Sequence, residues 1–381
     1  MQKKLIAAAV AGLIAVPALA QTNVTISGRF AMGYENYKLG SCATGFSCNS
    51  ESRVSDQSSR LIFNVMEDLG GGLSAWGQYD LRGGAGGAVD IGTWTNGGNS
   101  GLGLMSKQWG KFTLGRWDIH YQEIEAAIGG NRAGSLQTLT SNGLMSQVGG
   151  VSIANGTRTP NLMMWDSPNW NGFTARLAYS SQFVGAVGNE GSGKGLSGTG
   201  NPGSGDAWHA ALRYNNGPWT GGFSYFQGDT ESGTTGVAHA DQTSWRLWGG
   251  YTFAMGLKVG LGYDRSEIDA GINGGASTTF KRSAWTLPVS YAFGPHKVYG
   301  SYAKANDMSN TTGLDTGAHV WGLGYDYAFS KRTSAGIFYT QLNNKSAGTY
   351  QLFAVPGGNG ATVAAGGEDP RQIYIGMAHN F

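Results

Sequence analysis

Beyond its first twenty residues, the sequence has no uninterrupted apolar run of about 18 residues, the length that indicates a membrane-spanning helix. Such helices are therefore excluded from the rest of the chain. Charge is also scarce, since only 13% of the 381 residues are Asp, Glu, Lys or Arg and the formal net charge is +2. No global basic excess is present to attract nucleic acid, so a nucleic-acid partner is not expected.

Cysteine is nearly absent, because Cys42 and Cys48 are the only two in the sequence. No histidine lies beside them, so the pair does not indicate a metal site, and we expect neither a metal nor a cofactor. A disulfide that closes the short loop between them would suit an oxidising compartment. Two free thiols are the alternative, and we favour the disulfide.

Residues 1–20 carry the features of an export signal. Lys3 and Lys4 precede an apolar run from Leu5 to Leu19, which ends in the small-residue motif Ala-Leu-Ala at 18–20. This order predicts a secretory signal peptide that is cleaved before Gln21. An uncleaved helix is the alternative, although the run is short for a membrane span. Residues 21–381 are then expected to form one domain.

The dominant pattern in that domain is alternation over about ten residues, broken by turns. In the first such run Val24, Ile26 and Phe30 share one parity, while Thr25 and Arg29 share the other. One apolar and one polar face is the signature of a β-strand between two environments. Runs of this kind recur along the chain, and counting them predicts about sixteen strands.

The connections between these runs alternate between short and long. Short turns at 215–218, 254–256, 294–296 and 330–331 contrast with long Gly/Ser/Asn-rich stretches such as 183–206 and 343–370. Three Tyr-x-Phe motifs, at 251–253, 291–293 and 327–329, each precede a short turn, as an interfacial aromatic girdle requires. The pattern predicts an all-β fold, a transmembrane antiparallel β-barrel with short periplasmic turns and long extracellular loops. A soluble all-β protein is the alternative, but its apolar faces would need a second sheet.

The end of the chain fits the same interpretation. The segment 371–381 alternates and stops on Phe381, without a tail. We expect it to be the terminal strand, with Phe381 as an assembly signal.

One connection is unusually long and should matter for function. About residues 118–160 separate two alternating runs and form the third long loop, with 121–128 able to make about two helical turns. Loops of this length are usually functional or disordered. A sixteen-stranded barrel leaves a water-filled lumen, which this loop would narrow if it folded inward. An external loop is the alternative.

Arginines on the polar faces supply a second signal. Arg29, Arg60 and Arg82 come from early strands, so they should cluster on one stretch of inner wall. Arg116 shares the parity of apolar Leu114, and a bulge at Gly115 would be needed to turn it inward.

Acidic residues on the long loop, Asp118, Glu123 and Glu125, would face those arginines across the lumen. Basic rings favour anions, so the sequence predicts a modest anion preference. Structural salt bridges are the alternative role for any single arginine.

Several motifs occur together in one order: VTISGRF at 24–30, EDLG at 67–70, LGR at 114–116, DSPN at 166–169, YAFSKRT at 327–333 and a terminal Asn-Phe. With this order and spacing the chain resembles the general diffusion porins of Gram-negative bacteria, and most of all the betaproteobacterial family that includes neisserial and Burkholderia-type porins. The resemblance covers the whole of 21–381.

The resemblance implies a sixteen-stranded barrel in the outer membrane, assembled as a homotrimer, with the third loop folded into the pore. It implies passive diffusion of inorganic ions and small hydrophilic solutes, with outer-membrane lipid and lipopolysaccharide as surroundings. The basic pore wall of the family is carried over to Arg29, Arg60, Arg82 and Arg116, and the loop acids to Asp118, Glu123 and Glu125.

Three other functions were weighed. An enzyme is not expected, because the six histidines are scattered and none has a nucleophile at a suggestive spacing. An adhesive surface protein would leave the inward arginines without a purpose. A sugar-selective channel would need an aromatic ladder, and its candidates Trp76, Phe226, Trp248 and Phe338 are dispersed.

Overall fold

The computed structural model describes the barrel and parts of its loops. The described residues are 22–38, 50–57, 59–83, 94–95, 97–120, 123, 144–145, 147–148, 151–152, 158–181, 206–229, 238–272, 274–350, 352 and 366–381. The expected signal peptide at 1–20, the pair Cys42 and Cys48, the loop acid Glu125 and most of the expected helical segment at 121–128 lie outside this set. Within it, no helix is long and apolar enough to cross a membrane.

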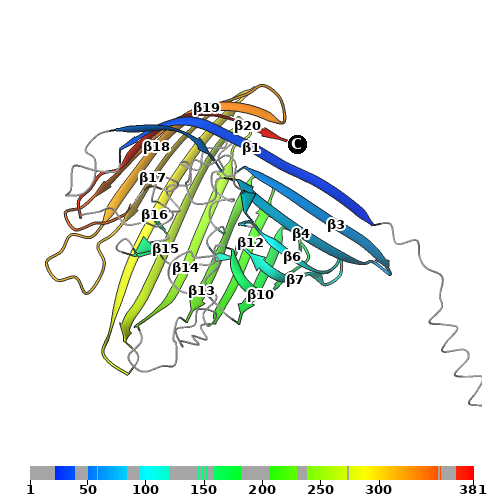
Figure 1. Cartoon of the computed structure of the whole chain (residues 1–381), viewed down its shortest axis with the longest axis horizontal. Helices are drawn as coiled ribbons and strands as arrows, with labels where there is room; N and C mark the ends of the chain where they lie inside the picture. The colour runs from blue at the N-terminus through cyan, green and yellow to red at the C-terminus, as the bar shows by residue number, and fades with distance from the viewer. Residues whose placement is uncertain are drawn as a thin grey trace, which may run out of the picture.

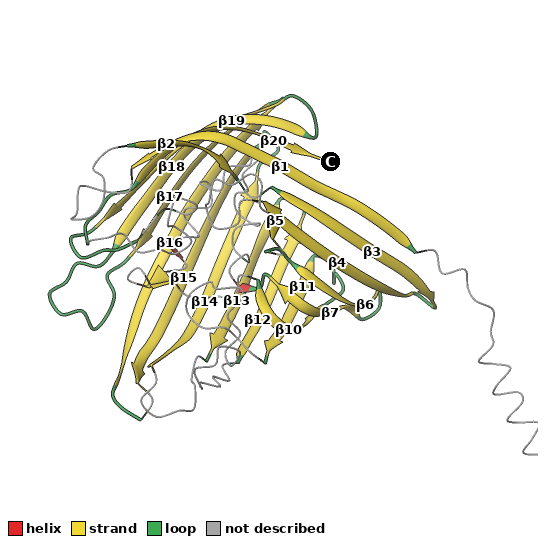
Figure 2. Ribbon diagram, viewed as in Figure 1, coloured by secondary structure: helices red, strands yellow, loops and turns green. Residues whose placement is uncertain are grey.

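The described chain is nearly all β-strand and closes into a barrel (Figures 1 and 2). The sheet contains 18 strands. Two of them continue the wall position of a neighbour in sequence: β2 (Glu51–Asp56) continues that of β3, and β5 (Trp94–Thr95) continues that of β6. The barrel wall therefore has 16 strand positions, which we call staves. The staves are β1 (Asn23–Lys38), β3 (Arg60–Gly70), β4 (Leu73–Gly83), β6 (Ser100–Ser106), β7 (Gly110–Trp117), β10 (Thr159–Asp166), β11 (Phe173–Ser180), β12 (Ala207–Asn216), β13 (Trp219–Gly228), β14 (Ala238–Thr252), β15 (Leu257–Ile272), β16 (Ser277–Phe293), β17 (His296–Ala305), β18 (Ala318–Ala328), β19 (Thr333–Asn344) and β20 (Arg371–Asn380). The predicted sixteen-stranded antiparallel barrel is confirmed.

The barrel closes where the first and last strands pair. β1 and β20 are antiparallel from Arg29 opposite Asn380 to Lys38 opposite Arg371. Beyond the strand end, Gly28 and Phe381 exchange two backbone hydrogen bonds of 3.1 Å. Every stave therefore has a neighbour on both sides, which leaves no open sheet edge in the membrane.

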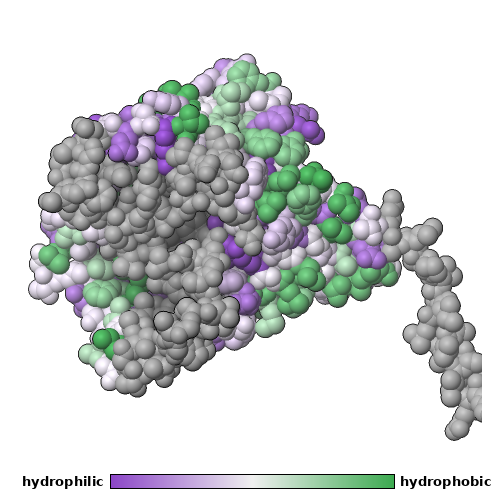
Figure 3. Space-filling model, in the orientation of Figure 1, coloured by the Kyte–Doolittle hydropathy of each residue, from purple (hydrophilic) through white to green (hydrophobic). Residues whose placement is uncertain are grey.

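Alternation separates an apolar outer face from a polar inner one, as predicted. On β1, the side chains of Val24 and Ile26 are 62% and 58% exposed, whereas Ala31 and Glu35 are completely buried. Figure 3 shows apolar side chains gathered on the wall where Figure 1 places β3 and β4. The Tyr-x-Phe motifs lie where expected, next to the short turns, with ring pairs such as Tyr327–Phe329 at 5.1 Å.

The wall is uneven in height, and this positions the functional site. β6, β7, β10 and β11 have 7 or 8 residues, whereas β14, β15 and β16 have 15 to 17. A strand of about 9–11 residues crosses a bilayer, so the tall strands rise above it on the long-loop side. The third loop leaves from the short wall, at the end of β7.

The contact between β1 and β20 at the seam of the barrel leads to a prediction about stability. The Phe381 ring lies 5.3 Å from that of Phe30 and covers Gly28, where a β-carbon would come within 2.6 Å of the ring. Phe381→Ala removes a half-exposed ring and should lower the free energy of unfolding by about 1–2 kcal/mol and reduce the folded yield. Guanidinium unfolding in detergent measures the first effect, and the electrophoretic shift of unheated protein measures the second. Phe253→Ala, which removes an exposed aromatic at the turn between β14 and β15, is the control. Equal losses in both variants would argue against a special role for the terminus.

Candidate functional site

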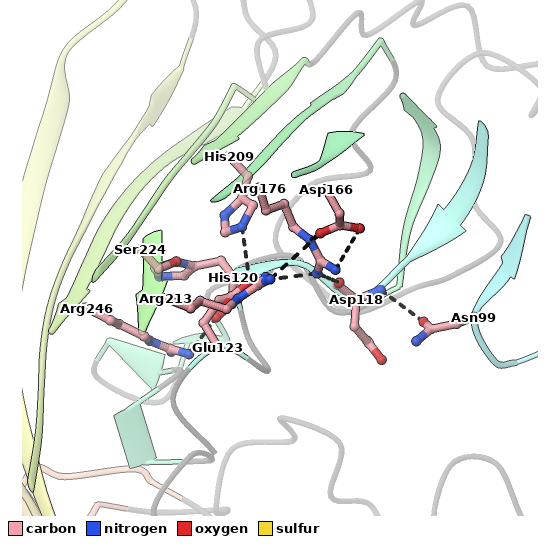
Figure 4. Close-up of polar contacts among 10 residues, drawn as sticks. All are labelled: Asn99, Asp118, His120, Glu123, Asp166, Arg176, His209, Arg213, Ser224 and Arg246. Atoms are coloured by element: carbon pink, nitrogen blue, oxygen red, sulfur yellow. Dashed lines mark hydrogen bonds and ion pairs between the residues drawn. The ribbon is translucent and has the colours of Figure 1, made fainter. Parts of the chain in front are cut away.

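The described parts of the third loop lie inside the barrel, against the inner wall of β12 to β16 (Figure 4). The chain turns inward after Trp117, and Ile119 and His120 are buried. The His120 ring lies between the hydroxyls of Ser224 on β13 and Ser244 on β14, with Nε2 2.9 Å from the Ser244 oxygen. The prediction that this loop folds into the lumen is therefore confirmed.

Two arginines of the tall wall bind the loop backbone. Arg246 donates to the carbonyl of His120 at 3.1 Å, and Arg282 donates to that of Met145 at 2.7 Å. Both guanidinium groups also bind the carboxylate of Asp264, at 2.6 and 2.7 Å. All three side chains are fully buried, so Asp264 compensates one of the two positive charges, and the remaining donors satisfy loop carbonyls.

Glu123 is the second anchor of the loop. Arg213 donates to both of its oxygens, while His209 and Arg176 approach to 3.4 and 3.8 Å. Burial by itself raises the pKa of Glu123, but the hydrogen bonds from Arg213 and His209 and the charge of Arg213 outweigh it and lower the pKa to about 2. The carboxylate is thus ionised and neutralised by the wall that it touches.

His120 is held neutral at the same place. Its complete burial, with Arg246 and His209 nearby, lowers its pKa well below the usual 6.5. One face of the ring stacks on Phe226 at 5.8 Å. Two arginines already lie at this site, since Arg246 binds the carbonyl of His120 and Arg213 binds the nearby Glu123. A proton on the His120 ring would add a further positive charge beside them.

Three of the four predicted wall arginines come together on the opposite side. Arg29 pairs in register with Arg60, and Arg60 with Arg82, so they lie on three adjacent strands. Arg82 binds Asp80 at 2.7 Å, and Arg158, at the end of the third loop, is close enough to act electrostatically on Arg60. We call Arg29, Arg60, Arg82 and Arg158 the basic cluster.

Arg116 lies elsewhere, and the expectation for it was wrong. The β6–β7 register runs unbroken through Gly115, so Arg116 keeps the outward parity of Leu114 while Trp117 points inward against Trp76. The irregularity is on β10, between Thr159 and Leu162, where two residues oppose one of β7. One of them is Pro160, which cannot donate a ladder hydrogen bond and so explains the location.

The two described acids of the loop, Asp118 and Glu123, do not lie together, and the predicted third acid, Glu125, is outside the described residues. Asp118 accepts from the backbone N–H of Arg158 at 3.0 Å and lies at the base of the loop. Glu123 faces Arg213, not the basic cluster. Among the described residues, no group of His, Cys, Asp and Glu could hold a metal ion.

Comparison with known proteins agrees with this geometry. The family model described as Gram-negative porin matches residues 7–347. The chain belongs to the Gram-negative porin family. An outer membrane porin protein of Bordetella pertussis is 26% identical, over 90% of this chain and 95% of the relative. Among solved structures, the anion-selective porin from Comamonas acidovorans has a TM-score of 0.70 at 22% identity, covering 95% of this chain and all of that one. The trimer form of OmpT from Vibrio cholerae has a TM-score of 0.63 at 14% identity, with 94% and 99% covered.

This porin is therefore an outer-membrane channel protein and not an enzyme. Its barrel forms a channel for passive diffusion. Of the residues that fix the loop in this porin, sequence patterns singled out Glu123 but not His120 or Arg282. Arg158 and His120 lie where alternation has stopped, and Arg282 meets Met145 across 137 positions of sequence.

The contacts of Glu123 lead to a prediction about how tightly the third loop is docked. Glu123→Gln leaves Arg213 and Arg176 facing a neutral amide, and loss of a buried partner should weaken loop docking by about 3 kcal/mol. Hydrogen exchange at the amides of Ile119 and His120 should then be much faster. Asp307→Asn removes a carboxylate from an exposed pair with Lys345 and should leave this exchange unchanged. Protection that persists in Glu123→Gln would show that the loop does not depend on this contact.

The pH dependence of docking follows from the same two residues. The folded pKa of His120 lies below its usual 6.5, so the undocked loop takes up a proton first and docking weakens as pH falls below 6.5. The folded pKa of Glu123 is about 2 against a usual 4.5, so further stability is lost from pH 4.5 downward. The protection factors of the loop amides, which correct for the intrinsic slowing of exchange in acid, should therefore fall in two stages, and His120→Gln should reduce the first. A flat profile from pH 7 to 5 would contradict the assignment to His120.

Proposed function

We propose that this porin is a general diffusion channel with a modest anion preference, which assembles as a homotrimer. The observation that carries the anion preference is the imbalance of charge around the lumen. The basic cluster lies on β1, β3 and β4 and at the end of the third loop, and Asp80 binds Arg82 within it. The acids that could oppose it, Glu123 and Asp264, are bound by arginines of the other wall. Rings of basic side chains favour anions.

Two comparisons support the proposal without deciding it. The Comamonas structure is described as anion-selective, and one OmpT structure is described as a trimer. Inorganic ions and small hydrophilic solutes are the proposed cargo, because no described inner surface is built for one ligand class.

A sugar-selective channel is disfavoured by the inner aromatic residues. Trp76, Phe226, Trp248 and Phe338 are all at most 8% exposed. Phe226 is covered by His120, and Trp248 packs in one cluster with Leu144 of the third loop. Rings that are covered by other side chains cannot offer a stacking track to a passing sugar.

Planar bilayers with purified, unheated protein test the proposal. In a KCl gradient the reversal potential should have the anion sign, and Arg60→Gln should lower the anion-to-cation permeability ratio about two- to fivefold, as expected for one charge several ångströms from the ion path. Arg265→Gln, on the outer face beside Glu267, should leave the ratio unchanged.

The same recordings test the rest of the proposal. Closure at high voltage in three equal steps supports a trimer, whereas single steps contradict it. A cation-selective wild type would contradict the charge argument, and folded protein without conductance would contradict the channel.

A further inference from the structure

A patch of small side chains lies on the inner face of β16, β17 and β18. Ala284, Ala305 and Ala318 are paired in register, one on each strand, and so form a row. A second alanine of β17, Ala303, lies one step nearer the short turns. Ala284 shares the strand parity of Arg282, which binds the third loop, so the row faces the lumen. We call these four alanines the alanine patch.

The alanine patch is covered, although it faces the lumen. Its members are at most 3% exposed. They belong to one apolar cluster with Leu144 and Met145 of the third loop and with Tyr350 and Leu352, which lie between β19 and β20 and are at most 1% exposed. We call the connection between β19 and β20 the last loop. Two loops from distant parts of the sequence thus share one core inside the barrel.

Asn344, the final residue of β19, binds the last loop at the level of the patch. It is paired in register with Ala318 and so continues the row of alanines. Its side-chain oxygen accepts from the N–H of Tyr350 at 2.9 Å, and its side-chain nitrogen donates to the carbonyls of Tyr350 at 2.9 Å and Glu368 at 2.6 Å. One amide has both donors and an acceptor, so it can bind the outgoing and the returning limb of the loop. Tyr350 is thereby fixed beside the alanine patch.

The polar anchors of the third loop leave its apolar side chains to be covered. The carbonyl of Met145 accepts from Arg282 at 2.7 Å and from Arg246 at 3.3 Å, which fixes one point of the loop backbone. The apolar side chains of Leu144 and Met145 can be removed from water only by packing. An alanine side chain extends one carbon beyond the backbone, so the patch alone cannot surround them, and protein interiors leave few voids. The side chains of the last loop complete this packing.

We infer that Tyr350 and Leu352 are positioning residues of the channel. They complete the core in which Leu144 and Met145 are buried, and in this way the last loop fixes the place of the third loop in the lumen. The width of the pore therefore depends on the last loop as well as on the third. The inference rests on the channel proposed above and on neither the anion preference nor the trimer.

Hydrogen exchange of the full-length barrel in detergent tests the positioning without any need for conduction. Tyr350→Ala and Leu352→Ala each remove a large part of the core, so the protection factors of the Leu144 and Met145 amides should fall about tenfold or more, as expected for a buried large-to-small change. Tyr350→Phe keeps the ring and should retain most of the protection. Amides of β3 and β4, elsewhere in the wall, should keep wild-type protection in every variant.

Two further variants separate the shared core from other effects in the last loop. Ala305→Leu crowds the alanine patch from the wall and should lower the same protection factors, although the last loop itself is unchanged. Lys345→Gln removes an exposed pair with Asp307 from the last loop and is the matched control, which should change third-loop protection less than about twofold.

Single-channel recordings show whether the loss of position reaches the pore. In Tyr350→Ala and Leu352→Ala the open channel should become noisier, with conductance levels that differ between openings, because the third loop is no longer held in one place. Tyr350→Phe and Lys345→Gln should give the steady level of the wild type.

The two readouts distinguish this inference from the channel proposal. Unchanged third-loop protection in Tyr350→Ala and Leu352→Ala, or a loss in Tyr350→Phe as large as in Tyr350→Ala, would overturn the inference. A loss that spreads to β3 and β4 would mean general destabilisation and would overturn it too, as would a steady wild-type level in spite of lost protection. Folded wild-type protein without conductance would contradict the channel, while hydrogen exchange would still decide whether the last loop holds the third.

Discussion

The constraint on which this structure depends is that lipid offers no partner to a backbone N–H or C=O group. An open sheet would leave two unpaired edges in hydrocarbon, so the first and last strands must meet. The pairing of β1 with β20, completed by the two hydrogen bonds between Gly28 and Phe381, satisfies this requirement. Closure gives every strand one side that faces lipid and one side that faces the lumen. Polar residues therefore point inward, where they line the lumen.

The inner charges divide into two groups with different consequences. On one wall, Arg213 of β12 and Arg246 of β14 meet acids, Glu123 and Asp264. Glu123 is itself part of the third loop, and Arg246 also binds a carbonyl of the loop. On β1, β3 and β4, arginines occupy adjacent register positions, with Asp80 bound to Arg82. The loop starts from the short wall and is bound by the tall one. Of the described loop acids, Glu123 is thus drawn to the wall opposite the basic cluster, whereas Asp118 stays beside Arg158 at the base of the loop.

The sequence predicted the barrel well because its signals are local. Strand parity, turn length and the Tyr-x-Phe motifs are each read within about ten residues, and all were confirmed. The site was harder, because its contacts join residues that are far apart in sequence, such as Arg282 and Met145. Arg116 shows the boundary between the two cases. The parity that Arg116 shares with Leu114 indicated the outer face. The expectation that Arg116 turns inward depended on a bulge in β7. The irregularity lies instead on the partner strand β10, at Pro160.

One residue type thus does three different things in this barrel, and its surroundings decide which. An inward arginine that meets a carboxylate and a loop carbonyl, like Arg246, is structural, because both groups hold its guanidinium. We propose that an inward arginine beside other arginines, like Arg60, acts on passing ions, because its field extends into water. An outward arginine is costly in hydrocarbon and tolerable at the interface. Arg116 lies near the long-loop end of β7, where its Nε donates to the carbonyl of Arg158.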